Sequence, residues 1–177
     1  MNKTLTTTAV AAVLLASLTA CSGKSSSASE QTSDGKSGSS AAPAVSKLLT
    51  ASTAFTGISG RVASARLSGT VTAANDPNHL LGRPGQYTSK VTFNDTRIKA
   101  GDVEGSDKGD VDRGGAIEAF AHHAEAKARA EYIQGFAKSM PALAEYDYVH
   151  GTVLVRVSHY LTPQQAAAYK TAADALS

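Results

Sequence analysis

The sequence is poor in cysteine and has no tryptophan. Its 177 residues include a single cysteine, Cys21. One cysteine cannot form a disulfide within the chain, so the fold must rest on packing alone. Long apolar runs are also lacking. The run at residues 9–16 is far shorter than the roughly 20 apolar residues that a membrane-spanning helix needs. Anchoring by a spanning helix is therefore not expected from this run.

A concentrated positive charge is absent from most of the chain. The whole sequence carries 17 Lys and Arg against 15 Asp and Glu, which gives a formal charge of +2. From Asn75 to the C-terminus, however, eleven basic residues face thirteen acidic ones. A nucleic-acid-binding domain normally shows a basic patch or stripe. We therefore expect no nucleic acid among the partners.

The N-terminus has the features of an export signal. Lys3 precedes the apolar run at residues 9–16, and small residues follow as far as Ala20. This order of a charged, an apolar and a small-residue region is typical of a secretory signal over residues 1–20. An ordinary secretory signal that happens to precede a cysteine stays a possible alternative to the more specific interpretation that follows.

The end of this signal, Leu18-Thr19-Ala20-Cys21, resembles a bacterial lipobox. The resemblance implies that the Cys21 thiol receives a diacylglyceryl group and that the signal is cut off before Cys21. Two acyl chains hold a protein stably on a bilayer, whereas one gives only marginal binding. We therefore expect a lipoprotein on the extracytoplasmic face of a cell membrane. Once acylated, Cys21 is available neither for catalysis nor for metal binding.

The segment after Cys21 has the composition of a tether. Residues 22–42 are rich in Ser and Gly and contain no Val, Ile, Leu, Met or aromatic residue. Such a segment cannot bury enough apolar surface to offset the entropy of ordering, and its ends lie about 25 Å apart on average. We divide the mature chain into lipidated Cys21 with its linker (21–43), a poorly defined N-terminal segment (44–74) and a folded domain (75–177).

Local patterns predict regular elements along the rest of the chain. Residues 87–94 alternate, with Tyr87, Val91 and Phe93 on one face and polar residues on the other, as in a half-buried strand. Thr162 followed three residues later by Gln165 forms a capping box at the start of the last helix. The expected elements are a short helix over 44–55, a weak strand over 61–72, a turn at 83–86, strands over 87–94, 116–120 and 146–158, a helix over 122–139 and a helix after Thr162.

This order of strands and helices indicates an α+β domain. A small sheet with two helices packed on one face, a two-layer sandwich, would bury the apolar stripes of both later helices. The strand over 116–120, the helix after it and the strand over 146–158 are expected to form a right-handed βαβ unit.

Two stretches of the chain resemble a known family. Residues 76–90 (DPNHLLGRPGQYTSK) are one, and Gly114 to Phe120 (GGAIEAF) with the following Ala-Lys-x-Arg helix is the other. Together with the lipobox they are similar to a family of small lipoproteins common among actinobacteria. The resemblance implies a lipid-anchored, extracytoplasmic protein. No activity is attached to that family, so no catalytic residue is carried over.

The segment from His79 to Tyr87 is the best candidate for a binding site. It places apolar, basic and aromatic side chains around a rigid Pro-Gly turn, and such loops on a scaffold often carry recognition. In the equally weighted alternative, Leu80 and Leu81 fill the domain's own core and the turn is structural. The candidate residues are His79, Leu80, Leu81, Arg83 and Tyr87.

No pattern for catalysis or metal binding is present in the sequence. Its five histidines lack a His-x-x-x-His spacing, and the acidic, glycine-rich loop over 101–115 does not match the spacing of a calcium-binding EF-hand loop. We expect no cofactor and no metal. Glu118 near a histidine would allow acid–base work, but a glutamate in a strand more often pairs with a basic residue, here Arg156.

These observations together predict a lipid-anchored binding module without enzymatic activity. Its partner would be a protein or a small ligand outside the membrane. The first alternative is a small cell-envelope hydrolase that uses Glu118 and a histidine, and the second is a purely structural envelope component. A carboxylate of raised pKa beside a histidine would favour the hydrolase, whereas a shallow apolar patch near Leu80 and Tyr87 would favour binding.

Overall fold

The computed structural model describes residues 48–177. The predicted signal at 1–20, the lipidation site Cys21 and the whole predicted linker up to residue 43 lie outside these residues. None of the helices in the described part combines the length and apolar character needed to cross a membrane.

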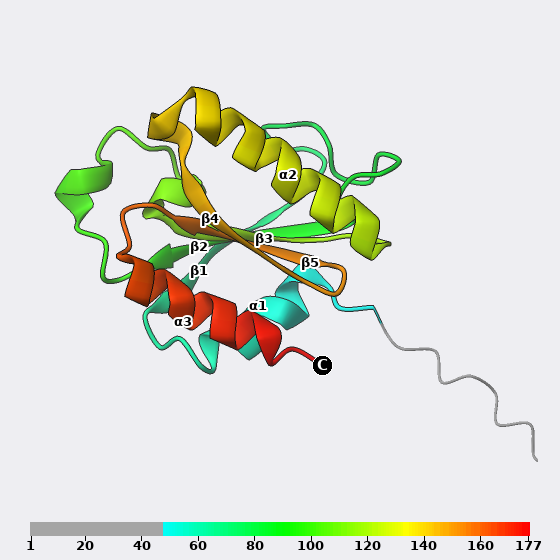
Figure 1. Ribbon diagram of the computed structural model, residues 1–177, viewed down its shortest axis with the longest axis horizontal. Coiled ribbons are helices and arrows are strands. Elements are labelled where there is room, and N and C mark those ends of the chain that lie inside the picture. Colours follow the sequence, from blue (N-terminus) through cyan, green and yellow to red (C-terminus); the bar gives the residue numbers. More distant parts are fainter. Residues whose placement is uncertain (1–47) are drawn as a thin grey trace, which may run out of the picture. The chain divides into compact units, whose positions relative to one another are not determined.

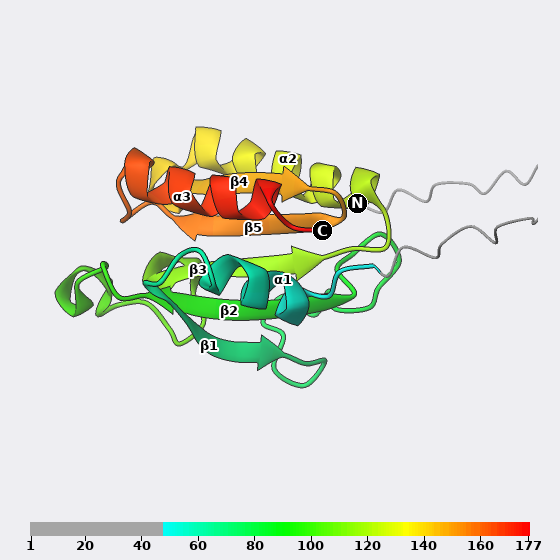
Figure 2. The same ribbon diagram turned by 90° about the horizontal axis from the view of Figure 1, so that it is seen from below.

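A five-stranded antiparallel sheet forms the centre of the domain. Its neighbouring strands follow the order β1-β2-β3-β5-β4, as Figure 2 shows. β3 lies in the middle, and all its residues are buried because the sheet continues on both sides and is covered on both faces. The strands are β1 (Ala65–Val71), β2 (Ser89–Asp95), β3 (Gly114–Ala119), β4 (Glu145–His150) and β5 (Val153–Ser158).

The helices cover both faces of the sheet. α1 (Ala51–Ser59) and α3 (Pro163–Asp174) lie on one face, and α2 (His123–Ser139) lies on the other (Figure 1). Short 3-10 helices η1 (Ala100–Val103), η2 (Val111–Arg113) and η3 (Pro141–Leu143) occupy the connections. The α+β class is confirmed. Two helices do share a face, but they are α1 and α3; α2 on the far side adds a third layer that was not predicted.

Residues of β5 explain why both faces need a cover. Val153, Val155 and Val157 belong to the larger core, with α1 and α3. Leu154, between them on the opposite face, packs into a smaller core with Ala126 and Ile133 of α2. The side of β5 toward α2 therefore carries one buried apolar side chain, Leu154, and one largely buried, ion-paired side chain, Arg156, so both faces of the strand are covered.

The prediction of a single strand over 146–158 is wrong. β4 and β5 are two strands of a hairpin, which pairs His150 with Val153 and turns at Gly151, where φ is +54°. Glycine adopts this left-handed conformation without steric cost. β5 pairs antiparallel with β3, so β3 and β4 run parallel with β5 inserted between them. β3, α2 and β4 therefore form a βαβ unit in a split form, in which β5 separates the two parallel strands.

The region before Asn75 belongs to the same domain. α1 begins at Ala51, seven residues later than predicted, because Thr50 and Thr53 form a capping box there. Phe55 and Ile58 of this helix are buried in the larger core, and β1 pairs with β2. A separate segment over 44–74 followed by a domain from 75 is therefore incorrect. The glycines in this region weaken the local sequence pattern for α1 and β1. Both elements are stabilised by packing in the larger core and by pairing with β2.

The remaining local predictions agree with the structure except at Tyr87. The turn at 83–86 has Gly85 at φ +72°, and the Gln86 N–H donates to the Arg83 carbonyl. Tyr87 precedes β2 and does not share the face of Val91 and Phe93; it lies in the smaller core. Nor is the other face of β2 open, since Lys90 and Thr92 are buried.

Candidate functional site

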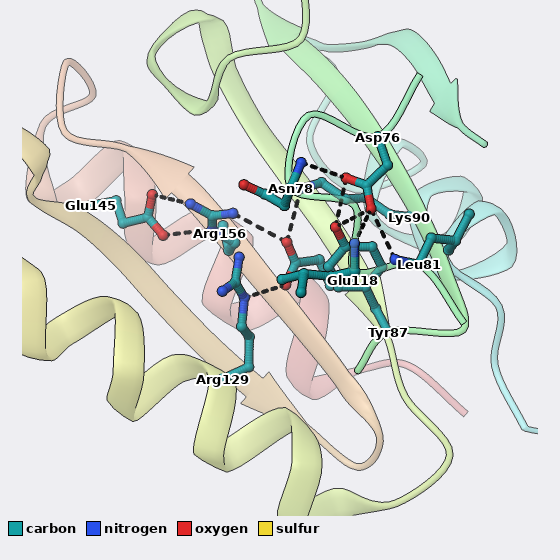
Figure 3. A network of polar contacts seen from close by, with 10 residues as sticks. Asp76, Asn78, Leu81, Tyr87, Lys90, Glu118, Arg129, Glu145 and Arg156 are labelled. Carbon is teal, nitrogen blue, oxygen red and sulfur yellow. Dashed lines mark hydrogen bonds and ion pairs between the residues drawn. The ribbon is translucent and has the colours of Figure 1, made fainter. Parts of the chain in front are cut away.

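A buried cluster of charged groups lies between the sheet and α2. Glu118 of β3 has no exposed surface, and three cations surround its carboxylate (Figure 3). The Lys90 ammonium on β2 lies 3.0 Å from Oε1, and the Arg156 guanidinium on β5 lies 3.1 Å from the same oxygen. Arg129 of α2 approaches the second oxygen, Oε2, to 3.1 Å. The predicted pairing of Glu118 with Arg156 is confirmed, whereas Lys90 and Arg129 were not foreseen.

Strand register explains this convergence. Lys90 is the direct cross-strand partner of Glu118, and Arg156 lies diagonally opposite on the other neighbour of β3. Arg129 is added from the layer above. Burial by itself raises the pKa of Glu118, but attraction to the three cations outweighs it and holds the pKa below its ordinary value. The carboxylate is therefore ionised and fully engaged.

The cluster extends to the edge of the sheet through Arg156. Its guanidinium donates one hydrogen bond to each carboxylate oxygen of Glu145 on β4, at 2.6 Å and 2.9 Å, in the bidentate geometry that arginine favours. Asp147, next on the same face of β4, accepts a hydrogen bond from Gln134 of α2. Its other oxygen, Oδ1, is buried without a partner among the described residues. Burial, followed by the charge of Glu145, raises the pKa of Asp147 to about 7.

The predicted binding segment is organised by Asp76. This buried carboxylate accepts the backbone N–H groups of Leu80 at 2.8 Å and Leu81 at 2.9 Å, and the Tyr87 hydroxyl at 2.7 Å. Burial acts to raise the pKa of Asp76, but these hydrogen bonds outweigh it and lower the pKa overall. Sequence reasoning missed the role of Asp76. The Asp-Pro-Asn turn signal was the only hint, since aspartate side chains often bind backbone groups just after them.

The five predicted binding residues do not form one surface. Tyr87 is fully buried, and its ring meets Phe120 edge-on, so it serves the core. Leu80 and Leu81 are half-buried and pack against the same cluster, while His79 and Arg83 are exposed. Tyr87 therefore serves the core of the domain and not a binding surface. The alternative that Leu80 and Leu81 fill the core is correct in part, since both are half-buried.

Part of the segment nevertheless lines an open groove against α2. This α2 groove has a volume of about 400 Å³, within the range of small-molecule sites. Arg129 contributes a cation whose Nε donates to Glu118 and whose guanidinium lies 5.6 Å from the centre of the Tyr132 ring. Its terminal nitrogens donate no hydrogen bond to any of residues 48–177. The lining residues are Leu80, Gly85, Gln86, Glu125, Ala128, Arg129 and Tyr132.

A second groove, about 380 Å³ in volume, lies over β1 and β2. Its lining includes Lys90, but the ammonium of that residue is already bound to Glu118. The acidic loop forms another side through Asp107 and Asp110. Within this loop, the Arg113 guanidinium donates to the carbonyls of Val103 and Ser106, so these two carbonyl oxygens already bind a cationic group of the chain itself. Both features make this groove the less favourable binding site.

The histidines lie apart from Glu118. His79 and His122 are exposed, and His123 contacts the Gly151 carbonyl through Nδ1. His150 contacts the carbonyl of Leu176, and His159 lies 3.6 Å from Asp112. None of the recorded partners of Glu118 is a histidine. Across residues 48–177, no three histidine, cysteine or acidic side chains come together in a group able to hold a metal ion.

Comparisons of the chain with protein-family models, curated proteins and solved structures found no match. The resemblance to actinobacterial lipoproteins therefore stays a prediction.

Proposed function

We propose that this protein is a lipid-anchored, extracytoplasmic binding module whose ligand occupies the α2 groove. The ligand would combine an apolar part with an anionic group such as a carboxylate. One observation carries the proposal: Arg129 lines a groove beside Leu80 and Tyr132, and its terminal nitrogens donate no hydrogen bond within residues 48–177.

The arrangement around Arg129 supports this choice of ligand. Glu118 and the Tyr132 ring restrain the guanidinium from two sides, so little side-chain entropy is lost when a ligand binds. Leu80 and Tyr132 supply apolar contact beside it. A restrained arginine presents two parallel N–H donors that match a carboxylate. The groove thus offers both an orienting charge and a surface for apolar burial.

The hydrolase alternative receives less support from the same geometry. A general acid at neutral pH needs a raised pKa, and the three cations shift the pKa of Glu118 downward instead. Its carboxylate is also buried and fully paired. Glu118 therefore acts as a positioning residue for Arg129 in this proposal.

A direct test uses small probes and backbone NMR of the mature chain with Cys21→Ser. Hydrocinnamate, an aryl carboxylate, is expected to shift the resonances of Gln86, Ala128 and the Arg129 Nε–H. Phenethylamine, similar in shape but cationic, is expected to bind more weakly. Tyr132→Ala should weaken hydrocinnamate binding, whereas Leu67→Ala removes an equally exposed side chain from β1 and should leave it unchanged. Equal responses to both probes would contradict the proposed site.

The anchor is tested separately in a bacterial host. The wild-type chain should fractionate with membranes and carry a diacylglyceryl mass on Cys21. A Cys21→Ser chain should appear in the soluble fraction. If the variant stays on membranes, or if the wild-type thiol is unmodified, the anchoring part of the proposal is wrong even when the groove binds its probe.

A further inference from the structure

A stripe of large apolar side chains is exposed along α2 and the short helix after it. Tyr132 is 58% exposed, Phe136 44%, Met140 45% and Leu143 55%. The rings of Tyr132 and Phe136 touch, with centroids 4.9 Å apart. Among residues 48–177, the other large exposed apolar residues lie in distant parts of the chain: Leu48, Leu67 and Tyr160.

This stripe is distinct from the face that α2 packs on the sheet. Ala126 and Ile133 form the buried face of the helix and belong to the smaller core. Tyr132, Phe136 and Met140 are spaced four residues apart, which places them along one side of the helix. A helix that needed only one partner would carry polar residues there. α2 therefore has a second apolar side that the described part of the chain does not cover.

We infer that this α2 stripe lies against the surface of the lipid bilayer to which the chain is anchored. The inference rests on the proposed anchor at Cys21. The sequence predicts a flexible linker over residues 22–42, and a chain of that length would span about 25 Å on average and keep the domain near the lipid. Tethering raises the effective concentration of the bilayer at the stripe, and a surface of low intrinsic affinity then binds.

The composition of the stripe fits a bilayer interface. Tyrosine and phenylalanine place their rings at the headgroup level, and leucine and methionine enter the acyl region. Lys127 and Lys138 are also exposed on α2, but at about 100° per residue they lie on the side of the helix opposite Tyr132 and Phe136. Lys127 is also paired with Glu131 at 3.6 Å, so apolar contact contributes more than charge. Because Tyr132 belongs to both features, the α2 groove would open beside the membrane.

The absence of tryptophan makes a clean test possible. Phe136→Trp introduces the only tryptophan of the chain on the stripe, and Tyr160→Trp introduces it at a similarly exposed aromatic position outside α2. The mature chain, Cys21 to Ser177, is coupled through Cys21 to a maleimide lipid in vesicles of phosphatidylcholine and phosphatidylglycerol. Phe136→Trp should show blue-shifted emission and quenching by brominated lipids, and Tyr160→Trp should show neither. Tyr132→Trp serves as a second reporter if Phe136→Trp does not fold.

Two outcomes would overturn the inference. One is unquenched emission from both stripe reporters in folded, coupled protein. The other is a blue shift of Phe136→Trp without vesicles, together with a dimer in light scattering, which would assign the stripe to a second copy of the chain. Chemical coupling replaces biological acylation, so failure here is independent of the fractionation result for Cys21.

Discussion

Glu118 compensates more buried charge than any other described residue. Three cations converge on it, and all are largely excluded from water. Glu118→Gln removes the negative charge and leaves the cations to repel one another. We expect the free energy of unfolding to fall by about 3–5 kcal/mol at pH 7, measured by urea denaturation.

The matched control is Glu131→Gln on the surface of α2. Glu131 pairs with Lys127 at 3.6 Å, and both side chains are about two-thirds exposed. Exposed pairs of this kind contribute at most about 0.5 kcal/mol, so the control should unfold almost like the wild type. A similar small effect for both variants would show that the buried cluster does not stabilise the fold.

Asp147 is expected to give the protein an unusual pH dependence. Its pKa in the folded state is about 7, against an ordinary value of 3.8, so the folded protein holds a proton that the unfolded chain has lost. Stability from this residue is complete below about pH 4 and declines as the pH rises to about 7. Neighbouring Glu145 opposes ionisation of Asp147, whereas Arg156 favours it.

Asp147→Asn tests this sign. The amide mimics the protonated acid, keeps an acceptor for Gln134 and cannot ionise. The variant should be more stable than the wild type at pH 8 and nearly equal at pH 4, measured by thermal unfolding across that range. A wild-type protein that gains stability between pH 4 and 7 relative to the variant would refute the assignment. Glu118 acts in the opposite sense, since its lowered pKa costs stability only under acidic conditions.

At the scale of elements, two glycines in regular structure have opposite roles. Gly115 of β3 faces Phe93 across the ladder, and a Cβ there would collide with the Phe93 ring and the Arg156 carbonyl. Gly135 of α2 is exposed, with nothing within 4 Å of an added Cβ. The first glycine is required by packing, and the second only weakens its helix.

Alanine at each position separates these roles. Gly115→Ala should lower the free energy of unfolding by about 3 kcal/mol, because overpacking forces neighbours to shift. Gly135→Ala should raise it by about 1 kcal/mol through helix propensity. Chemical denaturation of both variants measures the two effects. Destabilisation by Gly135→Ala would mean that this helix face contacts something that the described residues do not include.

At the scale of the whole molecule, residues 44–177 form a compact unit. Both cores and all the described elements lie within it. We therefore expect the Ala44–Ser177 fragment to unfold at the same temperature as the mature chain with Cys21→Ser, measured by calorimetry. The full-length mature chain is its own control. A lower midpoint for the fragment would show that residues 21–43 contribute contacts to the domain.

Local chemistry determined much of the fold. The capping box of Thr162 and Gln165 starts α3, and the Pro-Gly turn at 83–86 has its expected form. The α+β class follows from such signals, since each depends only on residues close in sequence. The pairing of Glu118 with Arg156 could also be predicted from the sequence, because both residues lie in segments of high β propensity and carry opposite charges.

Only the tertiary structure decided which faces are covered and which residues meet. Tyr87 was predicted to bind a ligand but is buried, since its ring packs against Phe120 and its hydroxyl donates to Asp76. α2 lies opposite α1 and α3, where it covers Leu154 of β5 and the ion pairs of Glu118, a placement hidden when β4 and β5 are taken as one strand. Arg129 reaches Glu118 only through that placement. Burial and charge pairing depend on distances between residues far apart in the chain, which local patterns do not specify.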